Sequence, residues 1–417
     1  MEIEGNGIAS PDATILRLIL DGLTRIDADG NLQPDLASSW NSGNNDHRWE
    51  FLLRPGVRFH NGWPLTPDRV IASLNESCNG DCPWTAVHAV GSSVVFTADS
   101  PVPNLPWLLA GNRFLVSLTD AGDGKPPPCC IGTGPFQLSS QDDPHSFAAN
   151  DSYWQGRPFI DKVEVLTGRS IRDQWLDLSV GRADIVEIPP EDLRQAQQQR
   201  LAVAASPPVE LLALRISDSG ALSNQALRAS ISEAVDRGAL FNVIFEKQGE
   251  IAASLLPQEL TGYSFLFPAD RDLSKARELR GGLTPPPLTL GYEGGGAMQL
   301  AAQRIALNLR EAGFDVQVVA ASRAQNSDLI LCRLPVQGAD PAAATEILLR
   351  AAGETVSVAE QTPLALFRAE REFLNRKTLV PLIDLPRAYA IGPRVRDLRL
   401  RGDGTPDLAS ASLEDAP

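Results

Sequence analysis

The hydrophobic positions in the first part of the chain follow helical spacing in some stretches and strand spacing in others. Aliphatic residues crowd residues 12–23, which predicts a buried helix. Trp49, Phe51 and Leu53 alternate with polar or mixed neighbours and predict a half-buried strand. The tripeptide Thr-Pro-Asp at 66–68 predicts a helix start, because it combines a hydroxyl N-cap, a proline at the first helical position and an acid favoured by the helix dipole.

The later part of the chain shows a regular order of strand, helix and strand. An apolar strand at 288–292 precedes a helix whose apolar side chains recur from Met298 to Leu309, and a second strand at 314–319 follows. Gly313 is predicted to cap the end of that helix. This order predicts a βαβ unit and therefore an α/β domain. Further elements are predicted as helices at 224–237, 272–280 and 362–374, and as strands at 24–30, 94–96, 162–166, 328–334 and 380–385.

Length and charge narrow the class of protein. The 417 residues suffice for two or three packed units, and 43% hydrophobic with 21% charged residues is typical of a globular chain. Fifty-two acidic against 37 basic residues give a net charge of −15, which repels phosphate backbones and anionic lipids. Nucleic acids and membrane surfaces are therefore poor partners. No apolar run reaches the roughly 18 residues that a membrane-spanning helix needs.

The first residues and the cysteines bear on the cellular compartment. The first five residues lack the basic, apolar and small-residue pattern of a signal peptide, so the chain is either cytoplasmic or a mature form with an added initiator methionine. Cys78 and Cys82 bracket a short loop and are predicted to lie within bonding distance, whereas Cys332 is predicted to be a buried free thiol. Together with the adjacent pair at 129–130, this close spacing favours an oxidising compartment.

Patterns of catalysis and metal binding are absent or incomplete. The chain has no nucleophile elbow, no His-Glu-x-x-His and no phosphate-binding loop with its lysine. The glycines at 294–296 predict a flexible turn, because the residues that would complete a phosphate loop do not follow. Four histidines and five cysteines raise a zinc hypothesis, but adjacent cysteines rarely chelate one tetrahedral ion. We therefore predict no catalytic residue, no metal site and no cofactor.

A series of short segments, taken in order, carries more information than any single motif. It begins with Asp-Gly-Leu-Thr-Arg-Ile-Asp at 21–27 and includes Trp-Glu-Phe-Leu-Leu-Arg-Pro-Gly-Val-Arg-Phe-His-Asn-Gly at 49–62. The other segments lie at 32–40, 64–70, 132–136, 150–154, 181–185 and 227–237. The series resembles the family 5 extracellular solute-binding proteins, which bind oligopeptides, dipeptides, nickel chelates and related solutes for ABC importers.

The resemblance implies a fold and a mechanism. Two α/β lobes of the class II periplasmic-binding-protein type would be joined by crossing strands, with the solute held in the cleft between them as the hinge closes. Lobe 1 would comprise residues 1–268 and 381–417, and lobe 2 residues 269–380, which makes the second lobe unusually short. The shortening falls after Asp340, in the stretch that in peptide binders supplies an aspartate for the peptide amine.

The resemblance also implies a function. The protein would be an extracytoplasmic, monomeric component of an ABC importer that delivers a peptide or another carboxylate-bearing solute to the permease and catalyses nothing. A metal-chelate binder is an alternative within the family. A ligand-sensing regulatory module on the same scaffold is a second alternative, and it would need a DNA-binding helix-turn-helix. An enzyme is a third, and it would need convergent titratable groups.

Candidate solute-binding residues come from strand ends and from one aromatic segment. In the first lobe Trp107 is a candidate pocket wall, and Arg113 is a candidate partner for a carboxylate because a guanidinium binds it through two parallel hydrogen bonds. Arg333 has the same role in the second lobe, and either arginine can instead form a surface ion pair. His60 is predicted as a structural turn residue rather than a ligand contact. The remaining candidates are Ile8, Ala9, Tyr292 and Glu293.

Overall fold

The computed structural model divides the chain into two compact units. Unit 1 comprises residues 1–187, 338–340 and 389–417, and unit 2 comprises residues 188–337 and 341–388. The chain passes from unit 1 to unit 2 in β10 (Ile185–Ile188) and returns in β16 (Leu379–Ile391). The structure describes all residues except 1–12, 29, 79–81, 120–130, 141–142, 167–168, 293–295, 321–326, 337–339, 355–361 and 415–417.

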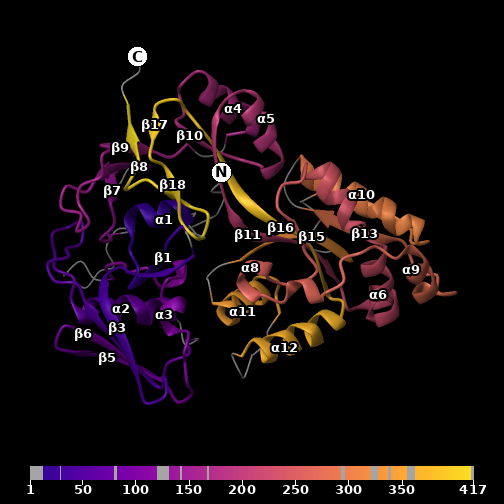
Figure 1. The fold of residues 1–417 in the computed structure, drawn as a ribbon, viewed down its shortest axis with the longest axis horizontal. Coiled ribbons are helices and arrows are strands. Elements are labelled where there is room, and N and C mark those ends of the chain that lie inside the picture. Colours follow the sequence, from indigo (N-terminus) through magenta and orange to yellow (C-terminus); the bar gives the residue numbers. More distant parts are fainter. Residues whose placement is uncertain are drawn as a thin grey trace. The chain divides into compact units, whose positions relative to one another are not determined.

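Unit 2 is built on a seven-stranded sheet (Figure 1). Besides β10 and β16, its strands are β11 (Ala202–Ile216), β12 (Glu250–Ile251), β13 (Leu288–Tyr292), β14 (Val316–Val319) and β15 (Leu329–Pro335). The path runs β10, β16, β11, β15, β13, β14, and β12 pairs with β16. The strand β13 is parallel to both β14 and β15, whereas β11 is antiparallel to β15. The sheet is therefore mixed, with its parallel part at one end.

Helices cover both faces of this sheet, because its strands carry apolar side chains on both sides. In β11, Leu212 and Leu214 belong to one core cluster, and Leu211 and Ala213 belong to another. The first cluster packs against α6 (Gln225–Ala234), α9 (Leu273–Arg280) and α10 (Ala297–Glu311), and the second against α11 (Pro341–Ala351) and α12 (Pro363–Asn375) (Figure 1). Shorter helices in the described part of unit 2 are α5 (Leu193–Gln198), α7 (Arg237–Ala239), α8 (Gln258–Thr261), η2 (Pro190–Asp192), η3 (Gly220–Ser223), η4 (Leu240–Ile244) and η5 (Ser264–Leu266).

Unit 1 contains several small antiparallel sheets instead of a single large one. The four-stranded sheet has the order β3 (Ala37–Gly43), β4 (Arg48–Leu53), β6 (Ser93–Thr97), β5 (Ala86–Val90), and the three-stranded sheet the order β7 (Phe136–Ser140), β8 (Asp143–Ala149), β9 (Lys162–Glu164). The paired short strands are β1 (Thr24–Ile26) with β2 (Leu32–Pro34), β17 (Val395–Arg396) with β20 (Ser412–Leu413), and β18 (Arg399–Leu400) with β19 (Pro406–Asp407). The helices are α1 (Ala13–Ile19), α2 (Pro67–Cys78), α3 (Leu105–Leu108), η1 (Asn112–Phe114) and α4 (Ile171–Ser179).

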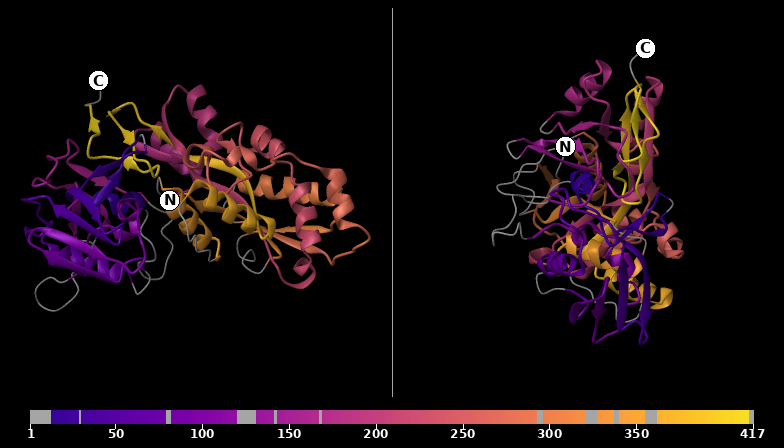
Figure 2. Two further views of the ribbon diagram at one scale, coloured as in Figure 1. Left: turned by 60° about the horizontal axis from the view of Figure 1, so that its bottom comes forward. Right: turned by 90° about the vertical axis from the view of Figure 1, so that its left-hand side faces the viewer.

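Two apolar cores hold unit 1 together. One lies between the four-stranded sheet and α2, where Phe51 and Phe96 are fully buried. The other joins α1 to the three-stranded sheet and to the C-terminal segment, drawn in yellow beside the indigo helix (Figures 1 and 2). A Cβ added at Gly134 would lie 2.5 Å from the carbonyl carbon of Ile19, so this close approach to the end of α1 requires glycine.

The structure confirms the strongest element predictions. The helix whose start was predicted at 66–68 is α2, which begins at Pro67. The predicted half-buried strand is β4. The segments β13, α10 and β14 form the predicted parallel βαβ unit, and Gly313 follows the helix with a φ of +94°. None of the helices in the described part of the chain is both long and apolar enough to cross a bilayer.

The first helix is shorter than predicted. It ends at Ile19, whereas the predicted helix extends to Leu23. The main chain beyond the helix bonds to other segments instead: the N–H of Val116 donates to the carbonyl of Asp21, and the N–H of Leu36 donates to that of Gly22. Pairing with distant chain segments therefore replaces the last helical turn.

The division into units also differs from the one read from the sequence. Residues 188–268 lie in unit 2, whereas the sequence assigns them to lobe 1. The reason is β11, which pairs with β15 from Glu210 to Ile216 and so belongs to the same sheet as the βαβ unit. Unit 2 thus has 198 residues and is similar in length to unit 1.

Candidate functional site

The carboxyl ends of the parallel strands β13 and β15 form a candidate ligand-binding edge within unit 2. From β13 the chain continues through α10 to β14 on one side, whereas from β15 it continues through α11 and α12 to β16 on the other. Open α/β sheets bind ligands outside the carboxyl ends of their strands, at the point where the strand order reverses. Tyr292 ends β13 directly opposite Leu331 of β15. Side chains just beyond this level are placed to meet a ligand.

Three charged side chains lie across three neighbouring strands at this edge. The Nη1 of Arg333 in β15 lies 3.7 Å from Oε2 of Glu210 in β11, and the Nε of Arg387 in β16 lies 3.4 Å from Oε1 of the same carboxylate. Both separations exceed the roughly 2.7–2.9 Å of a close charged hydrogen bond. Partly exposed pairs of this kind usually stabilise a fold by less than about 1 kcal/mol. The contact of Arg333 with Glu210 therefore has a small structural role, and the guanidinium of Arg333 is suited to an incoming anion.

A second carboxylate, that of Glu191 in η2, lies close to Arg333. The backbone N–H of Ala297, the first residue of α10, donates to this carboxylate. Burial raises the pKa of Glu191, and the Arg333 guanidinium acts against that rise. The Oε2 of Glu191 and the Nε of Arg333 are buried, and neither has a hydrogen-bond partner among the described residues. A buried polar atom left in that state costs roughly 1–3 kcal/mol, so a further polar group is expected to meet them.

The sequence does not single out Glu191, Glu210 or Arg387. They come from segments far apart in the chain, and only the pairing of β11 with β15 and β16 brings Glu210 and Arg387 together with Arg333. The one local signal is the position of Glu210 at the start of an apolar run, where a charged residue marks the exposed end of a buried strand.

The predicted candidates of this edge differ in exposure. Arg333 has 31% of its side chain accessible, whereas Tyr292 is only 7% exposed and belongs to the core beneath α10. The ring of Tyr292 is therefore mainly a packing group at the strand end. Ile8, Ala9 and Glu293 lie outside the described residues.

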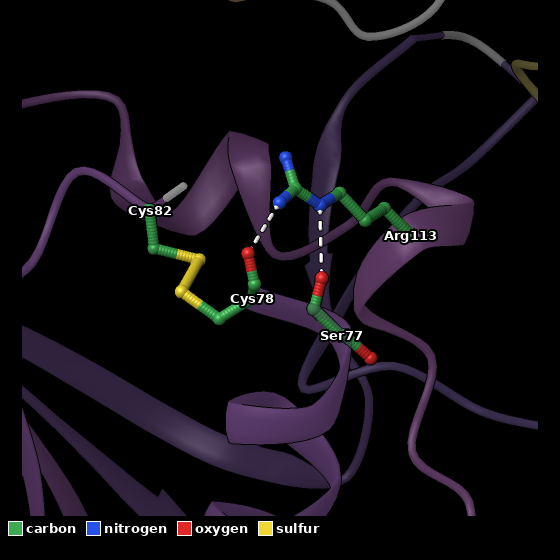
Figure 3. Close-up of a disulfide and its surroundings, with 4 residues drawn as sticks. All are labelled: Ser77, Cys78, Cys82 and Arg113. Atoms are coloured by element: carbon green, nitrogen blue, oxygen red, sulfur yellow. Dashed lines mark hydrogen bonds between the residues drawn. A yellow bond between two sulfur atoms is a disulfide. The ribbon is translucent and has the colours of Figure 1, made fainter. Parts of the chain in front are cut away.

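The candidates in unit 1 lie on neighbouring short helices. Trp107 is half-buried in α3, and Arg113 is exposed in η1. Figure 3 shows that Arg113 donates from Nε to the carbonyl oxygen of Ser77 at 3.2 Å and from Nη2 to that of Cys78 at 2.9 Å. Both carbonyls belong to the last turn of α2, where a cationic donor satisfies groups that lack intrahelical partners. Arg113 therefore has a structural role at this helix end.

The same helix end carries the predicted disulfide. Cys78 is bonded to Cys82, with Cα atoms 5.4 Å apart, as predicted (Figure 3). Cys332 takes no part in this bond. It was predicted to be buried, whereas in the structure it is half-buried. Its Sγ lies 3.7 Å from the carbonyl oxygen of Ala213 in the paired strand. The adjacent cysteines at 129–130 lie outside the described residues.

His60 makes two backbone contacts within unit 1. The N–H of Gly132 points at its Nδ1 at 3.3 Å, and its Nε2 lies 3.1 Å from the carbonyl oxygen of Gly134. A neutral ring protonated on Nε2 satisfies both contacts. Burial lowers the pKa of His60 in agreement with a neutral ring. These contacts support the structural role predicted for this residue.

A buried polar network in unit 1 has no counterpart in the sequence analysis. The carboxylate of Asp21 accepts hydrogen bonds from Thr133 at 2.9 Å, from the indole of Trp154 at 3.0 Å and from the hydroxyl of Tyr153 at 3.4 Å. Burial and the neighbouring Asp21 raise the pKa of Asp35 to about 7. The carboxylate of Asp21 is engaged within unit 1, so the network links distant segments of the fold.

The described part of unit 1 and unit 2 shows no metal centre, and a hollow in unit 1 carries charges of both signs. No group of three or more His, Cys, Asp or Glu side chains among the described residues could hold a metal ion. A hollow of about 560 Å³ in unit 1 is lined by residues of β8, β9 and α4. Its charges pair with one another, as in the 2.5 Å contact between Arg169 and Asp177. This hollow does not define a ligand class.

The geometry defines a class of protein before any comparison is made. Two α/β units are connected through β10 and β16, and unit 2 presents Arg333 near the carboxyl end of the parallel strand β15, with Glu210 and Arg387 on the neighbouring strands, an arrangement typical of ligand-binding proteins. Residues 31–347 match the model of the bacterial extracellular solute-binding proteins, family 5 Middle, and the chain belongs to this family. The resemblance read from the sequence is confirmed.

Solved structures of similar fold cover nearly the whole chain. NikA from Staphylococcus aureus in complex with Ni(L-His)2 aligns with a TM-score of 0.84 at 17% identity, over 97% of this chain and 96% of that one. The dipeptide-binding protein from Pseudoalteromonas sp. SM9913 in complex with Met-Leu aligns with a TM-score of 0.83 at 16% identity, over 98% and 97%. The predicted two-lobed periplasmic-binding-protein-like fold is therefore confirmed.

Curated relatives match over shorter stretches. The probable D,D-dipeptide-binding periplasmic protein DdpA of Escherichia coli is 26% identical over 284 residues, which are 63% of this chain and 55% of that protein. The HTH-type transcriptional regulator SgrR of Pectobacterium atrosepticum is 35% identical over 161 residues, which are 36% of this chain and 28% of that protein. The matched stretches thus span about a quarter to about half of these relatives.

Proposed function

We propose that this protein is the solute-binding component of an ABC importer. It captures a peptide or a related carboxylate-bearing solute outside the cytoplasm, hands it to the permease, acts as a monomer and carries out no chemical step. The observation that supports this most is the match of residues 31–347 to a family of extracellular solute-binding proteins, together with a fold shared over nearly the whole chain. The dipeptide named for one similar structure favours a solute of this size and charge.

The proposed solute contacts follow the strand ends and the short helices. Arg333 is the proposed partner for a solute carboxylate, because a guanidinium with a long contact to its own carboxylate can pair with a second one. Trp107 supplies an apolar wall. Arg113 also stays in the proposed set, although its substitution by alanine is expected to loosen the end of α2 as well. The remaining proposed contacts are Ile8, Ala9, Tyr292 and Glu293.

Native mass spectrometry of freshly purified protein tests the proposal. A solute-binding protein with a tight site is expected to retain its ligand, so the spectrum should show a mass above that of the chain, removed by partial unfolding and refolding. The released compound should bind again in calorimetry with one site per chain and emerge chemically unchanged. Slow conversion of that compound by the protein would contradict a purely binding role.

A second function is favoured by one observation, the match to the SgrR regulators. In this alternative the chain is the ligand-sensing part of a transcriptional regulator. The net charge of −15 argues against direct contact with DNA, since it repels phosphate. The two functions separate by gene context: neighbouring permease and ATPase genes support transport, whereas a solute-dependent change in transcription of neighbouring genes would support regulation.

A further inference from the structure

Glu191 and Arg333 are opposite charges that lie near each other without a complete set of contacts. Burial raises the pKa of Glu191 and the nearby charge of Arg333 acts against that rise, yet the described residues provide no hydrogen-bond partner for the Oε2 of Glu191 or the Nε of Arg333. Both atoms are buried. The acceptor on one side chain and the donor on the other are thus available at the same strand edge.

Glu191 occupies a position that links it to the connection between the units. It lies in η2, three residues after the end of β10, the strand in which the chain enters unit 2. Its carboxylate accepts the N–H of Ala297 at the start of α10. The side chain of Glu191 is therefore anchored near the carboxyl ends of β13 and β15. Its backbone follows shortly after β10, the strand in which the chain enters unit 2.

We propose that Glu191 is a tethered competitor for the anionic group of the solute at Arg333. This inference rests on the proposed function, because it assumes that a solute anion reaches this strand edge. In the absence of solute, the Glu191 carboxylate offsets the charge of the Arg333 guanidinium. A solute carboxylate pairs with Arg333 only by reducing that interaction. Glu191 therefore lowers the affinity of Arg333 for anions, and only an anion that binds strongly enough overcomes this competition. Glu191 is thus a specificity-determining residue.

The charged groups around the pair decide how the competition depends on pH. Asp192 lies on the same turn as Glu191, and Glu210 lies near both Arg333 and Arg387. Burial raises the pKa of Glu191 above that of an exposed glutamate. As the pH falls, Glu191 is thus protonated before an exposed carboxylate is, and the competition weakens. An anion that stays ionised should then bind more tightly at lower pH.

An anion titration of the full chain tests this competition with a defined probe. Acetate is added to protein labelled with ¹⁵N at arginine, and the Nε–Hε resonance of Arg333 is followed, assigned by its loss in Arg333→Lys. Glu191→Gln keeps an acceptor for Ala297 but removes the charge, so acetate should shift this resonance with about fivefold lower dissociation constant than in the unmodified protein. Asp192→Asn makes the same change of charge one residue away, and its dissociation constant should stay within about twofold.

Two outcomes would overturn the proposal. One is an acetate response that is equal in Glu191→Gln and the unmodified protein, and the other is a resonance of Arg333 that does not respond to acetate in either. If Glu191→Gln fails to fold, the unmodified protein alone decides: binding of methanesulfonate, which stays ionised, should strengthen by about threefold or more between about pH 8 and pH 5. A flat profile contradicts the proposal.

The failure of the proposed function gives a different pattern. If the protein binds no transported solute, native mass spectrometry and calorimetry find none, whereas the acetate titration still reports on the pair of Glu191 and Arg333. A solute that binds with equal affinity to Glu191→Gln and the unmodified protein, while acetate does not, would place the solute elsewhere and reject the inference alone.

Discussion

The two units use charged side chains in different ways. Unit 1 has 30 acidic and 17 basic residues, whereas unit 2 has 22 acidic and 20 basic residues. In unit 1, Arg17, Asp21 and Asp35 are buried, and Arg17 donates to the carbonyl oxygen of Ala110 at 2.6 Å. Unit 2 also buries charged side chains, such as Arg237 and Asp384, but Arg333 and Glu210 at its strand ends are partly exposed and form only a long contact with each other. Buried charge therefore occurs in both units, and unit 2 adds partly exposed charges that are available for binding.

The architectures explain this difference. Unit 1 is made of small sheets with two apolar cores, and polar cross-links such as Arg17 to Asp403, 3.9 Å apart, also join its distant segments. Unit 2 has one sheet covered on both faces, and apolar packing holds its helices. Buried charged side chains of unit 2, among them Arg237, Glu370 and Asp384, are exceptions to this rule.

Loss of Asp21 should have the largest effect on stability. Asp21→Ala leaves the buried donors of Thr133, Tyr153 and Trp154 without their acceptor, which should lower the free energy of unfolding by about 3–5 kcal/mol. Hydrogen exchange read by mass spectrometry should show faster exchange in α1 and β7. Asp21→Asn keeps an acceptor oxygen and should lose less than half as much. Unchanged exchange in unit 1 would mean that the network does not hold it.

Glu370 tests one of these exceptions in unit 2. Burial raises the pKa of Glu370 to about 7, while the N–H of Leu255 and the hydroxyl of Tyr263 donate to its carboxyl group. A raised folded pKa means that the group stabilises the fold below the usual glutamate pKa and that this contribution is lost as the pH rises through about 7. The free energy of unfolding of the unmodified protein should therefore fall between about pH 4.5 and 8, and Glu370→Gln should make this fall smaller by about 2–3 kcal/mol.

The matched control for Glu370 lies on the same helix. Glu372→Gln removes the same charge from an exposed position of α12, and its stability should follow the pH profile of the unmodified protein. Urea unfolding at several pH values provides the measurement. Parallel profiles for Glu370→Gln and the unmodified protein would show that the carboxyl group of Glu370 is not the source of the pH dependence.

Arg333 should affect binding far more than stability. Arg333→Ala is expected to weaken binding of the identified solute by about 1.5–3 kcal/mol, the size of a lost charged hydrogen bond, and to change stability by less than about 1 kcal/mol. Calorimetry measures the first quantity and urea unfolding the second. Arg350→Ala, an exposed arginine of α11 paired with Glu346, should leave the affinity within a factor of about two. Comparable affinities for the two variants would remove Arg333 from the site.

The sequence predicted elements with local signals and missed those that depend on distant pairing. The helix α10 was predictable from its apolar spacing and Gly313. The long strand β11 was not, because Pro207 and Pro208 interrupt its pattern. In the structure these prolines lie before Glu210, where the pairing with β15 begins, so the missing N–H groups cost no bond of that ladder.

The same physics limited the prediction of the site. Arg333 could be proposed from the sequence because it lies near the end of an apolar strand, a place that the sequence marks locally. Glu210 and Arg387 became its neighbours only through the order β16, β11, β15, which no local pattern specifies. For Arg113 the sequence suggested a ligand contact but not the structural role that the fold adds, in which two of its donors bond to carbonyls of α2.

His60 should give the smallest effect and separates a structural histidine from a binding one. His60→Ala removes the ring that connects to Gly132 and Gly134, which should lower the free energy of unfolding by about 1–2 kcal/mol with the affinity for solute unchanged. Burial lowers the pKa of His60, so its contribution is present above the usual histidine pKa and lost as the pH falls below about 6.5. His60→Ala should therefore lose less stability than the unmodified protein on acidification to about pH 5. The control His88→Ala, at an exposed position of β5, should lose as much stability as the unmodified protein. Weaker solute binding without loss of stability would instead assign His60 to the site.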